Sequence, residues 1–353
     1  MKKIVFLGDT ILNEEPLGIQ RYAYEIIKSI DRKILGIECE FLIPENVCCN
    51  ITFSHIRIVR YGKHKKGFVW RQTDYPKYLK NNNAIGVDLT LGLSIFAGGI
   101  VCLHDCIFED FPKDFVSIKD KLKRLSYLVR AYICVNNSKK ILTVSETSRK
   151  ELLKHYNVEG DKISVIYNAW QHMNRIEADD SIISKLNLKK GEYYFSLGSG
   201  LPHKNFEWIV HMAKNNKLSI FVVSGTNRLS KYSDILENIN LTNIIFTGFL
   251  SDGEIKSLMS NCKAFLHPAF MEGFGIPPLE ALSCGAKIAI SSSSCLPEIY
   301  GDSAVYFDPF NYDVNLEEIL TRETSAEETL QKYSWEKSAD KLFKILETLS
   351  CGE

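Results

Sequence analysis

The sequence predicts an α/β protein of two domains, each built around a parallel sheet. The length of 353 residues suits two domains of about 150 residues each. Two strongly apolar segments, residues 4–8 (IVFLG) and 193–197 (YYFSL), are each followed by a glycine-containing turn and a helical pattern. Continuous apolar strands are typical of parallel sheets, and the turn after such a strand is where α/β proteins bind ligands.

The first domain is expected to span residues 1–170. Its further strands are predicted near 39–43, 56–59, 100–103, 141–145 and 162–167. Helices are predicted from about 17 to 30, through 127–135 and over 147–156. Residues 170–190 are polar and are expected to form a linker with a short helix.

The second domain is expected to span residues 190–334. Its further strands are predicted over 218–223, 243–247 and 264–266, and its helices over 252–260, 279–284, 313–322 and 326–332. Residues 335–349 carry apolar side chains at helical spacing. They are expected to form the last helix of the chain, within 335–353.

Charge and hydropathy exclude several classes of protein. Lys and Arg together number 43, as do Asp and Glu, so no global field attracts nucleic acid, and no nucleic-acid motif is present. The apolar run after Met1 is too short for a signal peptide, and no run reaches about 18 apolar residues. A soluble, cytoplasmic protein is therefore expected, with peripheral contact at the inner face of the membrane left open.

That contact is suggested by a basic stretch over residues 51–80. Its basic residues are Arg57, Arg60, Lys63, Lys65, Lys66, Arg71, Lys77 and Lys80, and its aromatic residues are Tyr61, Phe68, Trp70, Tyr75 and Tyr78. One interpretation is a surface for an anionic membrane or a pyrophosphate-linked lipid acceptor. The other is an ordinary solvated loop and helix face.

The ten cysteines give no metal motif, since none forms a C-x-x-C pair. Cys102 and Cys106 flank His104. Strand alternation would place Cys102 and His104 on one face, but Cys106 follows in a loop, so no metal site is expected there. The loop Gly198-Ser199-Gly200 begins like a dinucleotide fingerprint. An NAD site is excluded because His203 stands at the third glycine position and the next strand offers no acid for a ribose.

The most constrained stretch runs from 267 to 308 and holds two carboxylates, Glu272 and Glu280. Glycines between them allow a tight turn close to a ligand, and Pro277-Pro278 suits the start of a helix. Free amides at that start favour anions or sugar hydroxyls. The plain alternative is that Glu280 is a first-turn helix residue and Glu272 a solvated loop charge.

The stretch E-G-F-G-x-P-x-L-E-A, followed by C-G, L-P-E and G-D, resembles the donor site of retaining glycosyltransferases of family four. The resemblance implies the GT-B fold, two Rossmann-like domains facing across a cleft. In this fold the last helix, here within 335–353, is expected to pack back on the first domain. It implies that Lys204 neutralises the donor diphosphate, Glu272 binds the sugar hydroxyls and Glu280 binds the ribose. Family members often carry arginine where Ser199 stands. The loop residues that would approach the donor are Gly273, Phe274 and Gly275.

Two positions of the first domain join the site through the same resemblance. Gly18 matches a glycine whose amide approaches the diphosphate, and His104 matches a histidine that faces the transferred sugar. From the residues alone, the favoured interpretation of His104-Asp105 is a satisfied polar pair at a strand end.

The implied chemistry is transfer of a sugar from a nucleotide-diphosphate donor to a glycan or lipid-linked acceptor. Lys204, Glu272 and His104 are expected to be catalytic. The chain contains no Asp-x-Asp, so no metal or other cofactor is expected. Similarity along W-R-Q-T-D-Y-P-K-Y-L-K is greatest to bacterial mannosyl- and rhamnosyltransferases of surface-polysaccharide assembly, which favours GDP-mannose. Two alternatives stay open: a related sugar-nucleotide epimerase or phosphorylase, and a non-catalytic nucleotide-sugar binder.

Overall fold

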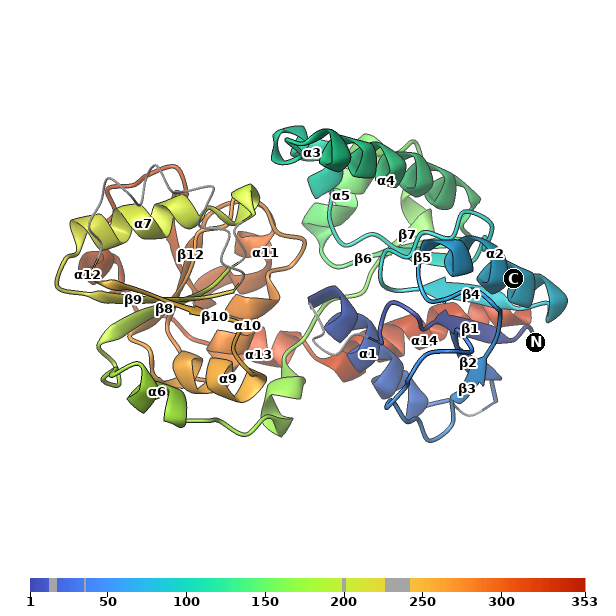
Figure 1. Cartoon of the computed structure of the whole chain (residues 1–353), viewed down its shortest axis with the longest axis horizontal. Coiled ribbons are helices and arrows are strands. Elements are labelled where there is room, and N and C mark those ends of the chain that lie inside the picture. Colours follow the sequence, from blue (N-terminus) through green and yellow to red (C-terminus); the bar gives the residue numbers. More distant parts are fainter. Residues whose placement is uncertain (13–17, 35, 199–200, 226–241, 353) are drawn as a thin grey trace. The chain divides into compact units, whose positions relative to one another are not determined.

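The chain folds into two compact units, shown in Figure 1. The computed structural model describes residues 1–12, 18–34, 36–198, 201–225 and 242–352. The N-terminal unit consists of Met1–Ala169 together with Ser334–Glu353, and the C-terminal unit of Trp170–Tyr333. Residues 170–190, expected to be a linker, are grouped with the C-terminal unit.

The N-terminal unit is built on a seven-stranded parallel sheet of order β3-β2-β1-β4-β5-β6-β7. Its strands are β1 (Ile4–Leu7), β2 (Cys39–Ile43), β3 (Arg57–Arg60), β4 (Ile85–Asp88), β5 (Ile100–Cys102), β6 (Lys140–Thr143) and β7 (Ile163–Val165). The order reverses between β1 and β4, as in Rossmann-like domains.

The helices of this unit connect the strands, and the last one returns from the far end of the chain. They are α1 (Gly18–Asp31), α2 (Phe68–Asn81), α3 (Ile107–Asp110), α4 (Ile118–Asn137), α5 (Glu146–His155) and α14 (Trp335–Cys351). Helix α14 packs along α1, where Trp335 meets the ring of Tyr22. The helical spacing of apolar residues over 335–349 coincides with α14.

The C-terminal unit has a six-stranded parallel sheet of order β10-β9-β8-β11-β12-β13. Its strands are β8 (Tyr193–Leu197), β9 (Ile220–Ser224), β10 (Ile244–Gly248), β11 (Ala264–His267), β12 (Ile288–Ser291) and β13 (Val305–Phe307). The order again reverses once, between β8 and β11, so the prediction of two Rossmann-like α/β sheets is confirmed.

Helices cover both faces of this second sheet, with α7 on one face and α6 and α9 on the other (Figure 1). The described helices are α6 (Ser181–Lys185), α7 (Phe206–Asn215), α9 (Asp252–Asn261), α10 (Ile276–Ser283), α11 (Leu296–Tyr300), α12 (Leu316–Ile319) and α13 (Glu327–Lys332). The core packs α7 against the strands, and Trp208 stacks on Phe307 with ring centroids 4.0 Å apart.

Three strands, β4, β12 and β13, were not predicted from the sequence. Each has only three or four residues, too few for a clear periodic signal, and β4 contains Gly86 and ends in Asp88. Their positions depend on pairing with neighbouring strands rather than on local propensity. Across the described residues, every helix is too short or too polar to traverse a bilayer.

The basic stretch over 51–80 is not a continuous surface. Trp70, Tyr75 and Tyr78 of α2 are buried against β1 and β2, and the Tyr75 hydroxyl donates to the Val5 carbonyl at 3.0 Å. Their spacing therefore reflects core packing rather than a surface lined by aromatic rings. Phe68, at the start of α2, is exposed.

Candidate functional site

The predicted donor residues of the C-terminal unit gather where the strand order of its sheet reverses. Strand β8 leads to Gly198, and β11 ends at His267. A small pocket lies between these strand ends, and its lining includes Gly198, Lys204, His267 and Pro268. The crevice beyond the carboxyl ends of parallel strands is the usual ligand site of such sheets. Ser199 lies outside the described residues.

The loop after β11 leads directly into helix α10. Gly275 adopts φ +82° immediately before the helix, a left-handed conformation that favours glycine. The helix begins at Ile276, three residues earlier than predicted, because Pro277 and Pro278 fit its first turn. Glu280 therefore does not lie in the first turn, as the sequence had suggested, but one turn further on.

Glu272 is the centre of a buried charged cluster. Its Oε1 lies 2.6 Å from Lys204 Nζ and 2.7 Å from His267 Nε2. The Lys204 side chain retains 24% exposure, whereas that of His267 is 3% exposed. The interpretation of Glu272 as a solvated loop charge is therefore wrong, because the carboxylate is buried and paired with groups from two other segments.

The cluster keeps Glu272 ionised. Burial by itself would raise the pKa of this carboxyl group, but the Lys204 ammonium and the hydrogen-bonded His267 hold the pKa well below its usual range. His267 was not singled out from the sequence. A histidine at the carboxyl end of a buried strand is a candidate site residue, as was argued for His104, and the same pattern could have identified His267.

The loop that carries Glu272 is fixed by contacts on both sides. Ser294 Oγ donates to the Glu272 carbonyl at 2.8 Å, and the Tyr300 hydroxyl donates to the Gly275 carbonyl. Phe274 turns its ring into the core, edge-on to Tyr333 with centroids 5.2 Å apart. Phe274 can therefore meet a ligand only through its backbone, as was predicted for Gly273 and Gly275.

Glu280 is also buried, and its Oε1 lies 2.7 Å from His172 Nε2. His172 belongs to a short 3₁₀ helix, Gln171–Arg175, within the segment expected to be a linker. Nothing in the local sequence marks His172, because its partner is 108 residues away. The pair orients the Glu280 carboxylate on the same helix that starts beside Gly275.

In the N-terminal unit, His104 follows β5 and is buried. Its Nε2–H donates to the Leu89 carbonyl at 2.9 Å, and its ring meets that of Tyr22 with centroids 4.9 Å apart. Tyr22 lies one turn beyond Gly18, the first residue of α1, so the fold brings both predicted residues to one region. Burial lowers the pKa of His104, which favours a neutral imidazole with Nδ1 as an acceptor.

Asp9 is a buried carboxylate that the sequence reasoning missed. It follows β1, where the strand order of the first sheet reverses. Its Oδ2 accepts from the Gly67 amide at 3.1 Å, and Arg71 Nε lies 3.8 Å away. Oδ1 has no hydrogen-bond partner within the described part of the chain. Burial raises the pKa of Asp9 to about 6, against the lowering effect of Arg71. An acidic residue directly after a buried strand is a candidate site residue, and this pattern could have identified Asp9 from the sequence.

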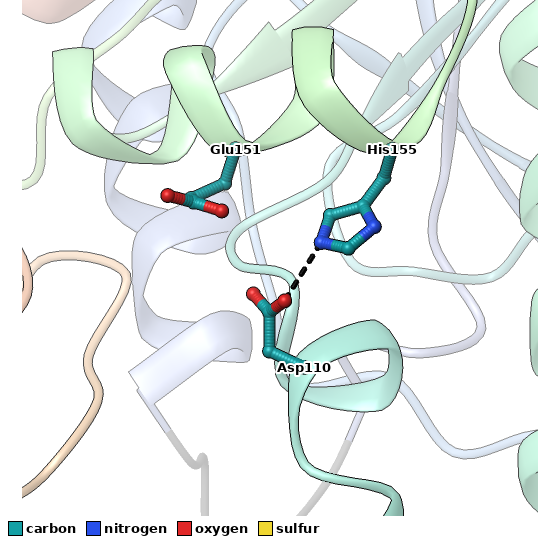
Figure 2. Close-up of side chains that lie close together, drawn as sticks. All are labelled: Asp110, Glu151 and His155. Carbon is teal, nitrogen blue, oxygen red and sulfur yellow. Dashed lines mark hydrogen bonds and ion pairs between the residues drawn. The ribbon is translucent and has the colours of Figure 1, made fainter.

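One group of side chains has the composition of a metal site (Figure 2). Potential ligand atoms of Asp110, Glu151 and His155 lie within 4.8 Å of one another. His155 Nε2 and Asp110 Oδ1 are 2.8 Å apart, and Glu151 pairs with Lys154 at 3.3 Å. These partners account for the cluster without an ion. It includes none of the predicted donor-site residues.

Comparison with known proteins identifies relatives. Residues 178–339 match the family model of glycosyl transferases group 1. The chain is 26% identical to O-antigen chain mannosyltransferase B of Escherichia coli, over 96% of this chain and 93% of the relative. It is 28% identical to O-antigen chain mannosyltransferase RfbU of Salmonella typhimurium, over 59% of this chain and 56% of RfbU. The chain thus matches little more than half of the length of RfbU.

Among solved structures, the Anabaena protein HepE in complex with UDP-glucose is similar over 99% of this chain and 100% of that one. The TM-score is 0.72 and the sequence identity 17%. At this identity the likeness shows the fold alone.

Proposed function

We propose that this chain is a retaining glycosyltransferase of the group 1 family with the GT-B fold, and that it transfers a sugar from a nucleotide-diphosphate donor to a glycan or lipid-linked acceptor. The observation that supports this most directly is the buried cluster of Lys204, His267 and Glu272 beside the pocket of the C-terminal sheet. A cation and an anion held together at such a place suit a ligand that carries both phosphates and hydroxyls.

In the proposed donor site, different residues bind the diphosphate, the sugar and the ribose of the donor. Lys204 has three donors, so it can stay paired with Glu272 and still donate to a diphosphate oxygen. The ionised Glu272 accepts hydrogen bonds from the hydroxyls of the sugar. Glu280, oriented by His172, accepts from the ribose hydroxyls. Backbone groups of Gly273, Phe274 and Gly275 and the start of α10 complete the site.

His104 and Gly18 are proposed to serve the same donor from the N-terminal unit. Because Nε2 already donates to Leu89, the neutral imidazole of His104 offers Nδ1 as an acceptor for a sugar hydroxyl. In this form it cannot give a proton to the departing phosphate. The Gly18 amide, at the start of α1, is a suitable donor to a diphosphate oxygen.

The proposed reaction follows a front-face path. The bond between the anomeric carbon and the diphosphate oxygen breaks, the acceptor oxygen bonds to the same face, and its proton passes to the departing diphosphate. A double displacement would need a carboxylate nucleophile on the opposite face of the sugar, and no residue is assigned to that task. Lys204 and the helix start stabilise the charge on the leaving group, which is the role that a metal often plays elsewhere.

The donor sugar is proposed to be mannose, carried by GDP. The support is that both O-antigen relatives described above are named mannosyltransferases, at 28% and 26% identity. The structural neighbour HepE binds a UDP sugar, so the base is the part of the donor that requires measurement.

The experiment is a thermal-shift panel with UDP, GDP, ADP and dTDP, each alone and as sugar conjugates, followed by a transfer assay with the best donor. A ligand at 100 times its Kd stabilises the native state by about 2.7 kcal/mol. One nucleotide that stands out identifies the base. A donor that binds but is never transferred to any glycan or lipid-linked acceptor would contradict the proposed activity, and no shift with any nucleotide would contradict the donor site.

A further inference from the structure

Helix α4 exposes a continuous row of apolar side chains. Ile118, Leu122, Leu125, Val129 and Tyr132 are between 51% and 79% exposed, and we call these five residues the apolar stripe. Their spacing alternates between four and three residues, which places all five on one face of an α-helix. Single exposed apolar residues are ordinary, but a row along most of a 20-residue helix is not.

The stripe is not the face that α4 uses to pack on its own unit. The buried residues of the helix are Tyr127, Ala131, Cys134 and Val135, which lie on the opposite side. Tyr127, for example, stacks on Phe108 with ring centroids 3.9 Å apart. The helix is therefore anchored on one face, and its second apolar face has no role in the core of the N-terminal unit.

The start of α2 extends this apolar surface. Phe68 and Val69 are 54% and 51% exposed. The Arg130 guanidinium of α4 lies 5.6 Å from the centroid of the Phe68 ring, so the two helices meet at this place. The apolar surface thus combines two segments that are separated by some fifty residues in the chain.

Basic side chains accompany both segments. Helix α4 contains five basic residues and one acidic residue. The residues that we call the lysine rim are all exposed: Lys63, Lys65, Lys66, Lys119, Lys121 and Lys123. Lys63, Lys65 and Lys66 lie shortly before Phe68, and Lys119, Lys121 and Lys123 lie in the first two turns of α4.

We propose that the apolar stripe, with Phe68 and Val69, is a membrane-binding surface that inserts into the interface of an anionic phospholipid bilayer while the lysine rim contacts the headgroups. An amphipathic helix with apolar residues on one face and Lys and Arg beside it is suited to this position. A second copy of the chain fits less well, because pairing two such stripes would bring two lysine rims of like charge together. This surface does not depend on the identity of the donor or the acceptor.

The test is co-sedimentation of the full-length protein with vesicles of phosphatidylglycerol and phosphatidylcholine, and with vesicles of phosphatidylcholine alone. Binding is expected to require the anionic lipid and to weaken as salt is raised. Leu122→Gln or Leu125→Gln is expected to lower the partition coefficient about tenfold. Lys121→Gln and Lys123→Gln are expected to lower it roughly fivefold each.

Matched controls come from the C-terminal unit. Leu218→Gln changes a fully exposed leucine, and Lys217→Gln an exposed lysine, at a place without an apolar row. Both variants are expected to bind vesicles like the unaltered protein. Hydrogen exchange should slow over residues 118–132 on anionic vesicles, because insertion shields the helix.

Several outcomes would overturn the proposal. One is equal binding to both kinds of vesicle, or none to either. Another is that Leu122→Gln and Leu218→Gln behave alike. A third is a lipid-free dimer that Leu122→Gln converts to a monomer while vesicle binding is unchanged, which would assign the stripe to self-association. Nucleotide binding in the thermal-shift panel is measured separately, so failure of this proposal is distinguishable from failure of the proposed activity.

Discussion

Lys204 Nζ and Glu272 Oε1 lie 2.6 Å apart, within a pair that links the loop after β8 to the loop after β11. The pair stands where the strand order of the C-terminal sheet reverses, and His267 contacts the same carboxylate oxygen. A buried ion pair of this kind costs desolvation on both sides, so each charge depends on the other.

Removing one member of this pair should cost more stability than removing both. We expect Lys204→Met to destabilise the fold because, among the residues that the structure describes, it leaves the buried Glu272 carboxylate with His267 as its remaining side-chain partner. In a double-mutant cycle with Glu272→Gln, the coupling energy should be about 1–3 kcal/mol, measured by denaturant unfolding. Additive effects of the two substitutions would show that the pair is not energetically coupled.

The two other polar site residues should affect different kinetic constants. Glu280→Gln removes a charged acceptor proposed to bind the ribose and should weaken donor binding by about tenfold. His104→Ala removes an acceptor proposed to face the sugar and should lower kcat by about tenfold or more with less change in donor affinity. Donor titration and steady-state kinetics separate these effects, and His211→Ala, at a half-buried histidine of α7 outside the proposed site, is a control. Near-normal constants in both variants would refute the assignment.

Asp9 should make stability depend on pH. Its pKa is raised by burial to about 6, so between about pH 4 and pH 6 the native state keeps a proton that the unfolded chain has lost. The free energy of unfolding should therefore fall by about 3 kcal/mol across this window as pH rises. Asp9→Asn keeps an acceptor for Gly67 and should remove most of that fall. Unfolding at several pH values checks this, and the exposed Asp313→Asn should leave the curve unchanged.

Gly275 and Gly285 provide a matched pair of substitutions. Both have φ of +82°, but a Cβ at Gly275 would lie 2.7 Å from Leu296 Cδ2, whereas one at Gly285 would meet nothing within 4 Å. Gly285→Ala should cost about 1 kcal/mol from backbone strain alone. Gly275→Ala should cost about 3 kcal/mol and disturb the Glu272 loop, which lowers donor affinity. Similar losses in thermal unfolding would mean that Leu296 moves aside freely.

Activity should not require a divalent metal, because Lys204 and the start of α10 are proposed to stabilise the leaving diphosphate. Adding EDTA to the transfer assay should leave the rate unchanged. Asp110→Asn combined with His155→Gln, which removes two of the three candidate ligands in Figure 2, should also leave it unchanged. A large loss of rate that Mg²⁺ or Mn²⁺ restores would contradict this expectation.

Much of the fold could be predicted because it depends on local patterns. Apolar strands such as β1 and β8 and the amphipathic helix α14 are found within a residue or two of their predicted limits. The short strands β4, β12 and β13 could not be found in this way, since only neighbouring strands hold them in place. The start of α10 was placed too late because three compatible residues after Gly275 extend the helix toward its N-terminus.

The sequence alone determined two Rossmann-like sheets and the glycine-rich loop that carries Glu272. Tertiary structure decided the partners, because side chains distant in the chain meet only when strands and helices pack. Glu272 meets Lys204 across 68 residues, and Glu280 meets His172 across 108. The same packing buried Trp70 and Tyr75, which the sequence had offered for a surface, and left the stripe of α4 exposed. Periodicity shows that a helix has an apolar face, but only the assembled neighbours determine whether that face is covered.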